Sequence, residues 1–186
     1  RDLRMSRGLG DVYKRQETEI TMIYLDHGAT TAVLPEVVEA MTPYFMEYYG
    51  NPSGNYEYGE TSKKAIEQVR RTIADSLGAQ PEEIYFTAGG TESDNWALHG
   101  MADLHPGGHI ITTQIEHHAI LHTCEYLEKK GMRVTYLPVD EKGMISLDQL
   151  EDAICEETCM ISVMFANNEI GTIQPVSYTH LTLPTT

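Results

Sequence analysis

Long apolar runs are missing from this 186-residue sequence, and none approaches the roughly 18 residues that a membrane-spanning helix needs. The first sixteen residues carry charge without an apolar stretch behind them, which argues against a secretory signal peptide. Cysteine is scarce, with three residues and no C-x-x-C pair, so neither a disulfide framework nor a cysteine-rich zinc site is indicated. We therefore expect a cytoplasmic protein in a reducing compartment, with no membrane partner.

Positive charge is also in short supply. The sequence holds 13 Lys and Arg against 28 Asp and Glu, a net charge of −15. A surface of that sign repels phosphate backbones, so we expect no nucleic-acid partner. The hydrophobic content of 41% is that of an ordinary globular protein, and the length predicts one domain with one substantial core.

The two ends differ in composition from the middle of the chain. Residues 1–16 hold five of the 13 basic residues and only two acids, whereas residues 177–186, SYTHLTLPTT, are uncharged. Both ends resemble translated adapter sequence of the kind that contaminates assembled sequencing reads. We expect 1–16 and 177–186 to be foreign segments, and 17–176 to be the part that folds.

Strand-like and helix-like segments alternate between these ends, which predicts an α/β fold with a mainly parallel sheet and flanking helices. The helix at 60–78 is the clearest, because apolar residues recur four apart from Ala65 to Leu77 and a glycine follows. Pro43 should bend or shorten the helix at 35–50. Further helices are expected from 91 onward, at 118–131 and at 146–154, and strands at 84–87, 109–113, 133–139 and 160–165.

One junction between a strand and a helix carries two glycines and a hydroxyl, in the stretch FTAGGTESDNW (86–96). Glycine permits a positive φ and a close approach of a bound group, and a helix start offers unpaired N–H donors. Gly90 and Thr91 are therefore suited to holding a phosphate. The alternative is a plain loop in which Thr91 caps the helix and the nearby acids interact with its dipole, and the spacing alone does not decide between the two.

Two further strand ends carry polar side chains. Residues 116–118 (EHH) follow the strand at 109–113, and residues 167–169 (NNE) follow the strand at 160–165. In open α/β sheets, ligands bind beyond the carboxyl ends of the strands. We therefore expect both groups and the residues at 89–91 to line one crevice.

Each of these polar groups also has an ordinary interpretation. His118 and His122 are four residues apart, as two metal ligands on a helix would be, yet no H-E-x-x-H motif accompanies them. Solvated or capping histidines explain them better, and we predict no metal site. Asn167 and Asn168 are equally compatible with a turn that closes the strand.

Five separated segments, taken together, resemble the cysteine desulfurases, which are pyridoxal-phosphate enzymes of the aminotransferase class V group. The segments follow the family's order over almost all of 22–176: YLDHGATT, GNPSGNYEYGE, FTAGGTESDNWALHG, IITTQIEHHAILHTCEYLEKKG and FANNEIGTIQPV. The resemblance implies that 17–176 is part of the large domain of a fold-type I transferase, with pyridoxal 5′-phosphate as cofactor. It implies that Gly90 and Thr91 hold the cofactor phosphate, that His117 is the catalytic histidine stacked on the ring, and that Asn168 hydrogen-bonds the ring hydroxyl.

The same resemblance implies an enzyme that removes sulfur from L-cysteine, giving alanine and an enzyme persulfide for iron–sulfur cluster or thio-cofactor assembly. It implies a homodimer that serves a sulfur-acceptor protein, with a chain about twice this long. The Schiff-base lysine and the nucleophilic cysteine would follow the residues given, so we expect this chain to lack activity. The alternatives are another class V aminotransferase or a selenocysteine lyase, which share the cofactor site, and a non-catalytic fragment.

Overall fold

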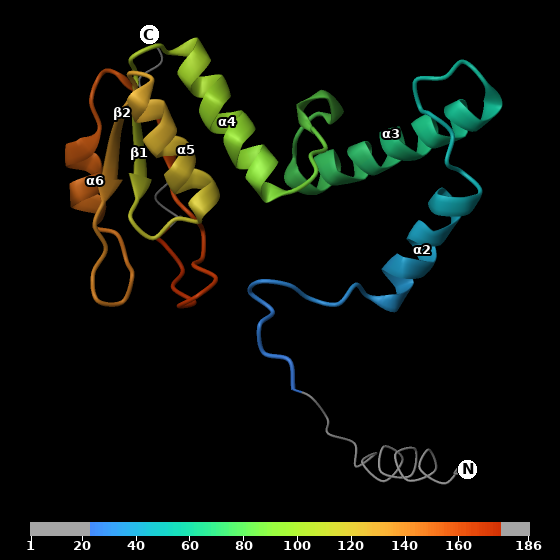
Figure 1. Ribbon diagram of the computed structural model, residues 1–186, viewed down its shortest axis with the longest axis horizontal. Helices are drawn as coiled ribbons and strands as arrows, with labels where there is room; N and C mark the ends of the chain where they lie inside the picture. The colour runs from blue at the N-terminus through green and yellow to red at the C-terminus, as the bar shows by residue number, and fades with distance from the viewer. Residues whose placement is uncertain (1–22, 176–186) are drawn as a thin grey trace, which may run out of the picture. The chain divides into compact units, whose positions relative to one another are not determined.

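A computed structural model describes residues 23–175, in which helical elements come first and short strands and helices alternate after them (Figure 1). The chain divides into two compact units, Arg1–Val33 and Leu34–Thr186. The second unit contains the elements α2 (Pro35–Met46), α3 (Glu57–Leu77), η1 (Pro81–Glu83), α4 (Gly90–Leu104), β1 (His109–Thr113), α5 (His118–Lys129), β2 (Arg133–Leu137), α6 (Leu147–Ala153) and β3 (Thr158–Ser162).

The described part of the first unit, residues 23–33, contains a turn held by local hydrogen bonds. The Tyr24 hydroxyl donates to Asp26 O at 3.0 Å, and His27 Nδ1 lies 3.0 Å from Thr31 Oγ1. Both bonds link residues close in the sequence, so this turn depends on its own side chains.

The three strands form one parallel sheet with the order β2-β1-β3, which confirms the predicted α/β class. The middle strand, β1, is buried along its whole length. It pairs in continuous register with β2, and its register with β3 shifts between His109 and Ile110. Because the strands are parallel, their carboxyl ends meet at one edge of the sheet, where the loops after β1 and β3 begin.

Alternating side chains of β1 fill separate cores on the two faces of the sheet. Ile110 packs with Leu98 of α4 and Cys124 of α5, whereas Ile111 packs on the other face with Leu150 of α6. Successive strand residues point to opposite faces, which explains the division. The chain moves from β1 to β2 and then back past β1 to β3, so right-handed crossovers place α5 and α6 on opposite faces.

The amphipathic helix predicted at 60–78 is confirmed as α3, which extends from Glu57 to Leu77. Gly78 follows it in the left-handed conformation, with φ of 67° and ψ of 26°. The Ala79 N–H then donates to Ala74 O at 2.9 Å, closing the last turn. A side chain with a Cβ is strained at this φ, so the glycine is what lets the helix end here.

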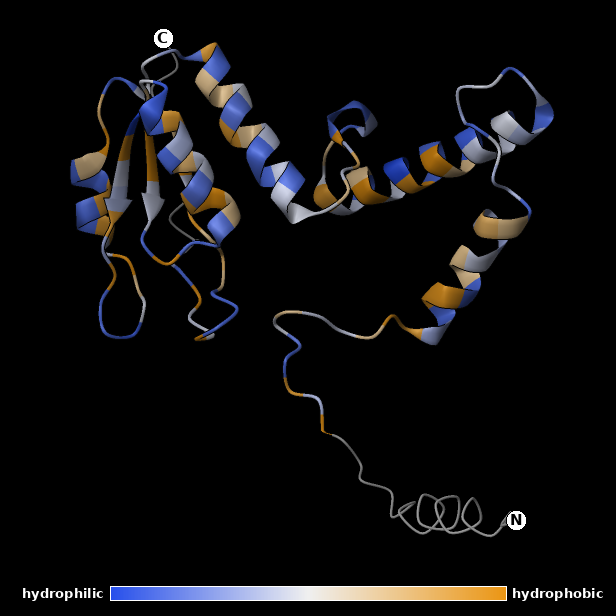
Figure 2. Cartoon of the chain, viewed as in Figure 1, coloured by the Kyte–Doolittle hydropathy of each residue, from blue (hydrophilic) through white to orange (hydrophobic). Residues whose placement is uncertain are grey.

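α2 is shorter than predicted and exposes its apolar side chains. It ends at Met46, with Pro43 inside its last turn, and none of its residues is buried. Val38 and Phe45 are 51% and 71% exposed, and Figure 2 shows apolar positions along the helix. The part of the chain that the structure describes therefore leaves this apolar surface uncovered. Within residues 23–175, no helix combines the length and the apolar character needed to cross a bilayer.

The strand predicted at 84–87 is not formed. These residues run without regular structure from η1 to α4, and none of the three described strands pairs with them. Tyr85 and Phe86 are 65% and 48% exposed, and the Arg70 guanidinium lies 4.9 Å from the centre of the Phe86 ring. A β-rich composition favours a strand where a neighbouring strand supplies ladder hydrogen bonds, and no described strand lies beside residues 84–87.

Candidate functional site

The first turn of α4 presents backbone donors to solvent. Gly89 precedes the helix in an extended conformation, and Gly90 is the first helical residue. The N–H groups of Glu92 and Ser93 donate to Gly89 O at 3.1 and 3.2 Å, whereas those of Gly90 and Thr91 have no acceptor within the described residues. A Cβ on either glycine would meet no atom within 4 Å, so a ligand has room to approach. An open helix start of this kind suits an anion.

Two features that the sequence allowed at this turn, a left-handed glycine and a cap by Thr91, are absent. Neither Gly89 nor Gly90 adopts the left-handed conformation, because Gly89 is extended and Gly90 is helical. Thr91 does not cap the helix, because it is already the second residue of α4 and no side chain makes a capping bond there. Glu92 Oε2 instead accepts the N–H of Ala88 at 2.6 Å. The Thr91 side chain is exposed, and its hydroxyl can meet a ligand.

Asn95 joins α4 to α5 beside this helix start. Its Nδ2 donates to Thr91 O at 2.8 Å, and its Oδ1 accepts the hydroxyl of Thr123 on α5 at 2.8 Å. Thr123 is buried. Sequence analysis assigned no role to Asn95, although its spacing of four from Thr91 places both on one face of the helix.

His117 caps the start of α5, and its ring is exposed. Its Nδ1 accepts the N–H of Ala119 at 3.1 Å. A backbone N–H can only donate, so Nδ1 holds the lone pair and the proton of the neutral ring is on Nε2. The cap therefore orients the ring and makes Nε2–H the donor that a ligand meets.

Thr91 and His117 line the same surface pocket. An adjoining pocket shares Thr91 and Asn95 and continues to Ala88 and Gly89. The start of α4 and the imidazole of His117 thus face adjoining space. The other residues that line the first pocket are Asn95, His99, His118, Ala119, His122, Thr123 and Tyr126.

The histidine pair on α5 is arranged as its spacing predicts. The rings of His118 and His122 are stacked, with centroids 4.9 Å apart and planes inclined by 19°. Within residues 23–175, no group of three or more His, Cys, Asp or Glu side chains is placed to hold a metal ion. The pair forms part of the pocket wall.

Two buried side chains join the loop after β1 to the loop after β3. Glu116 Oε1 accepts the Thr113 hydroxyl at 2.9 Å and the Met164 N–H at 2.8 Å. Asn167 Nδ2 donates to Ile115 O at 3.0 Å. Both loops are therefore held together at the carboxyl edge of the sheet. Of the groups expected to share a crevice with residues 89–91, His117 and His118 line the pocket of Thr91, whereas none of residues 167–169 lines it.

The environment of Glu116 is unusual for a carboxylate. Burial raises the pKa of Glu116, the hydrogen bonds from Met164 and Thr113 lower it, and the charge of Asp94 raises it again. The loss of solvation on burial is the largest of these effects. The Glu116 carboxylate is therefore less favourable here than in water.

Asn168 lies in the loop after β3 with its side chain exposed. Its Nδ2 donates to Glu169 Oε1 at 3.1 Å, and it is not among the residues that line the pocket of Thr91 and His117. Of the four predicted site residues, the structure brings Thr91 and His117 to one pocket, with Gly90 next to Thr91. It places Asn168 outside that pocket.

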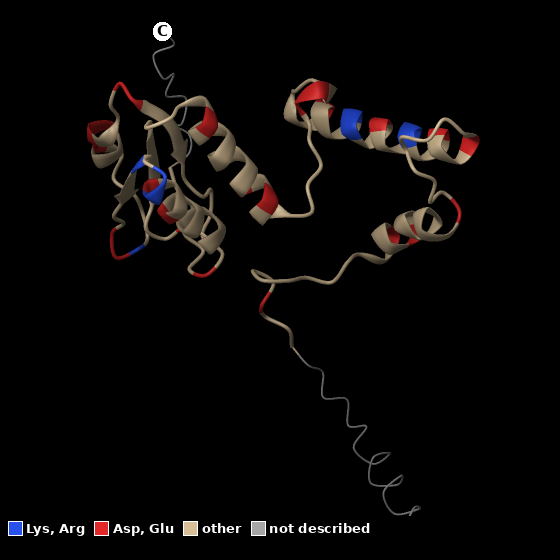
Figure 3. Cartoon of the chain, turned by 45° about the horizontal axis from the view of Figure 1, so that its top comes forward, with Lys and Arg blue, Asp and Glu red and all other residues tan. Residues whose placement is uncertain are grey.

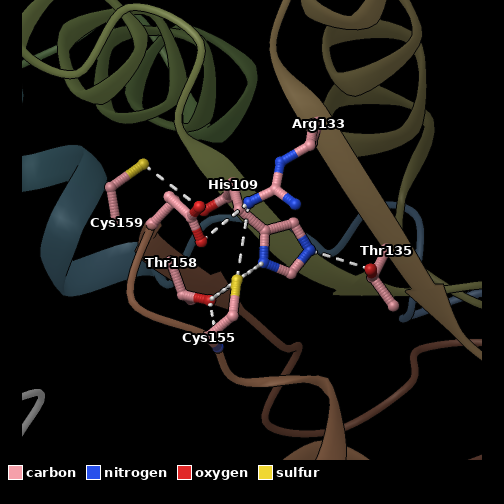
Figure 4. A network of polar contacts seen from close by, with 7 residues as sticks. His109, Arg133, Thr135, Cys155, Thr158 and Cys159 are labelled. Atoms are coloured by element: carbon pink, nitrogen blue, oxygen red, sulfur yellow. Dashed lines mark hydrogen bonds and ion pairs between the residues drawn. The ribbon is translucent and has the colours of Figure 1, made fainter.

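A second polar network lies at the opposite end of the strands (Figure 4). His109 is 5% exposed, with Nδ1 2.9 Å from Thr158 Oγ1 and Nε2 2.8 Å from Thr135 Oγ1. Cys155 Sγ lies 3.4 Å from His109 Nδ1 and 3.5 Å from a guanidinium nitrogen of Arg133. Burial, and then the Arg133 charge, lower the pKa of His109. This network joins all three strands and is separate from the pocket.

Comparison with known sequences identifies a family and several similar proteins. The family model described as "Aminotransferase class-V" matches residues 23–180. The cysteine desulfurase IscS of Methanosarcina thermophila is 60% identical over 161 residues, which make up 86% of this chain and 40% of that protein. The cysteine desulfurase IscS of Clostridium botulinum (strain Kyoto / Type A2) is 54% identical over 156 residues, or 83% of this chain and 39% of that protein.

Solved structures give the same result. A NifS-like protein is 44% identical with a TM-score of 0.80, over 83% of this chain and 43% of its own. The structure of SspA in complex with cysteine is 44% identical with a TM-score of 0.79, over 83% of this chain and 45% of its own. The chain thus spans 40% and 39% of the length of the two curated relatives described above.

Proposed function

Because the chain belongs to the class-V aminotransferase family, we propose that it forms the cofactor-binding part of a cysteine desulfurase, which removes sulfur from L-cysteine and leaves alanine. Curated relatives at 60% and 54% identity carry the desulfurase name. That name favours a desulfurase over a selenocysteine lyase, another class V aminotransferase or a non-catalytic fragment. The observation that carries the proposal is the single pocket lined by Thr91 and His117.

The residues at the start of α4 fit the phosphate of pyridoxal 5′-phosphate. The open N–H groups of Gly90 and Thr91 are donors, and the exposed Thr91 hydroxyl adds a third. No Lys or Arg lines this pocket, and half of the eight basic residues within 23–175 lie on α3 (Figure 3). Backbone donors and the helix dipole, rather than a basic side chain, would therefore hold the phosphate in this part of the protein.

His117 and Asn168 fit the aromatic ring. The imidazole of His117 is a flat surface whose orientation is fixed by the cap on Ala119 N–H, which suits stacking. Asn168 is exposed at the same edge of the sheet and carries an amide that can hydrogen-bond the ring hydroxyl. We propose His117 as the catalytic histidine and Gly90, Thr91, His117 and Asn168 as the cofactor-binding residues.

When bound, pyridoxal 5′-phosphate supplies an electron sink for the substrate amino acid. The chain's own residues bind and orient it: α4 holds the anion, and the start of α5 supplies the stacking ring. The neutral His117 also presents a proton at Nε2, because Nδ1 is occupied by the Ala119 N–H.

The covalent chemistry requires residues that this pocket does not supply. None of the five described lysines lines it; they are Lys63, Lys64, Lys129, Lys130 and Lys142. Cys124 is fully buried, and its burial raises the thiol pKa to about 11, which disfavours a nucleophilic thiolate. We propose that the Schiff-base lysine and the sulfur-accepting cysteine belong to a part of the protein outside this chain, so that the chain alone is inactive.

The remaining proposals concern the whole protein. We propose L-cysteine as substrate, a homodimer, a sulfur-acceptor protein as partner and a cytoplasmic location. We also propose that 1–16 and 177–186 are foreign to a partial transferase domain at 17–176. Those two segments lie outside the described residues.

Ligand titration of the 186-residue chain tests the cofactor proposal. Trp96, the single tryptophan, lies on α4 and reports binding through its fluorescence. We expect pyridoxal 5′-phosphate to bind more tightly than pyridoxal, and Thr91→Ala to weaken only the phosphorylated ligand. Thr72→Ala, an exposed helical threonine on α3, is the matched control and should change neither.

Equal binding of the two ligands, or binding of neither, would contradict the proposed phosphate site. Alanine should not form when L-cysteine and cofactor are added to this chain. Its formation would show that the chain carries the lysine and cysteine that we place elsewhere.

A further inference from the structure

Glu116 stands between a strand end and the proposed stacking histidine. Its Oε1 accepts two hydrogen bonds, from the hydroxyl of Thr113, the last residue of β1, and from the Met164 N–H of the loop after β3. The side chain is 8% exposed. One carboxylate oxygen thus links the loop that leads to His117 with the loop that contains Asn168.

Asn167 makes a second link between the same loops. It is 7% exposed, and its Nδ2 donates to Ile115 O at 3.0 Å. Its Oδ1 accepts the N–H groups of Glu169 and Ile170 at 2.9 and 3.1 Å, which folds the chain around Asn168. The backbone on both sides of Asn168 is therefore tied to the loop that leads to His117.

The two loops show the same pattern, in which a buried polar residue immediately precedes an exposed one. Glu116 precedes His117, and Asn167 precedes Asn168. The buried member of each pair bonds across to the other loop, while the exposed member stays available. Retaining a desolvated carboxylate is costly, and several satisfied donors are what make it tolerable.

We infer that Glu116 and Asn167 are positioning residues, which set the separation of His117 and Asn168 so that both meet one cofactor ring. The inference rests on the proposed function and extends it, because neither residue touches the cofactor in this assignment. Their action is confined to the ring, since the phosphate donors lie on α4.

Ligand binding by variants of the 186-residue chain tests this inference. Glu116→Ala removes the bond from Met164 that crosses between the loops and the local bond from Thr113, whereas Glu116→Gln keeps an oxygen that accepts both. Glu151→Ala, an exposed acid on α6, is the matched control. The probes are pyridoxal 5′-phosphate and inorganic phosphate, read by Trp96 fluorescence, together with the circular dichroism that the bound cofactor acquires from its asymmetric site.

We expect Glu116→Ala to weaken the binding of pyridoxal 5′-phosphate roughly tenfold to a hundredfold, by analogy with residues that orient the metal-binding side chains of metalloproteins. Its induced circular dichroism should diminish, and its affinity for inorganic phosphate should be unchanged. Glu116→Gln should restore most of both cofactor signals, and Glu151→Ala should match the wild type. If Glu116→Ala does not fold, Asn167→Ala carries the same test, because it removes the other bond between the loops, from Asn167 Nδ2 to Ile115 O.

Three results would overturn the inference. Unchanged cofactor affinity and circular dichroism in Glu116→Ala would refute the positioning role while leaving the proposed function intact. An equal loss of cofactor and phosphate binding would show a general structural role. A wild-type chain that binds no pyridoxal 5′-phosphate would refute the proposed function and this inference together.

Discussion

Asn95 on α4 accepts a hydrogen bond from the Thr123 hydroxyl on α5, with 2.8 Å between the oxygen atoms. The same side chain donates to Thr91 O at 2.8 Å. One amide therefore connects the helix whose start faces the proposed phosphate to the helix capped by His117. The separation of the two proposed ligand groups depends on this contact.

Breaking this contact between Asn95 and Thr123 should lower the stability of the chain. Asn95→Ala and Thr123→Val each leave a partner unpaired, so we expect each to lower the free energy of unfolding by about 1–2 kcal/mol. Urea unfolding of both single variants and the double variant measures the coupling, which should be about 1 kcal/mol. Strict additivity of the two losses would show that the bond contributes nothing.

Two glycines should respond in opposite directions to alanine. Gly78 ends α3 with φ of 67°, so Gly78→Ala should destabilise the chain by about 1 kcal/mol. Gly100 lies inside α4, where a Cβ would meet no atom within 4 Å, so Gly100→Ala should stabilise it by about 0.5–1 kcal/mol. Thermal unfolding measures both, and shifts of the same sign would contradict the assigned conformations.

Glu116 should make stability depend on pH. Burial raises the pKa of Glu116, so the folded chain binds this proton more tightly than the unfolded chain. The contribution of Glu116 therefore falls as pH rises through its folded pKa, and the free energy of unfolding of Glu116→Gln should rise relative to that of the wild type as pH increases above the ordinary glutamate pKa of about 4. Urea unfolding at several pH values measures the difference, and a flat difference would contradict the burial.

Asp140 provides a comparison of opposite sign. Its Oδ1 accepts the N–H groups of Met144 and Lys142 at 2.8 Å each, and these bonds hold the pKa of Asp140 below its usual value. Its contribution is present above the unfolded pKa and is lost as pH falls through the folded pKa. The free energy of unfolding of Asp140→Asn should therefore fall relative to that of the wild type as pH rises toward the ordinary aspartate pKa of about 4, in the same unfolding experiment.

The cysteines should react with iodoacetamide at different rates. Cys124 is 0% exposed, and burial, with smaller effects of Glu128 and Glu116, raises its thiol pKa to about 11. Cys155 is only half-buried and lies beside the Arg133 guanidinium. Peptide mass spectrometry of the native chain should find Cys155 labelled first and Cys124 protected, and the difference should disappear in urea. Equal native labelling would contradict the packing of α5 on the sheet.

Elements whose sequence pattern is local could be predicted from the sequence alone. The repeat from Ala65 to Leu77 with a glycine behind it predicted α3, and the run HIITT predicted the bounds of β1. The stretch at 84–87 failed because strand formation depends on a neighbour, which composition does not reveal. The extended Gly89 likewise follows from how the chain enters α4, not from glycine's conformational range.

Part of the site could also be predicted from the sequence. The strand-end rule predicted that the loops after β1 and β3 meet, and the bond from Met164 N–H to Glu116 joins them. The rule could not show that Glu116 and Asn167 point inward, because that depends on contacts between residues about fifty positions apart in the chain. Asn95 was missed for the same reason.

The central place of β1 has a consequence for how the sheet can be enlarged. Its two neighbours, β2 and β3, already satisfy both of its sides, and each of them has an outer margin that no other described strand occupies. Further strands of a longer polypeptide can join at those margins without disturbing any ladder bond of β1. The position of His117, which follows β1, therefore depends on the residues described here and not on how many strands are added to the sheet.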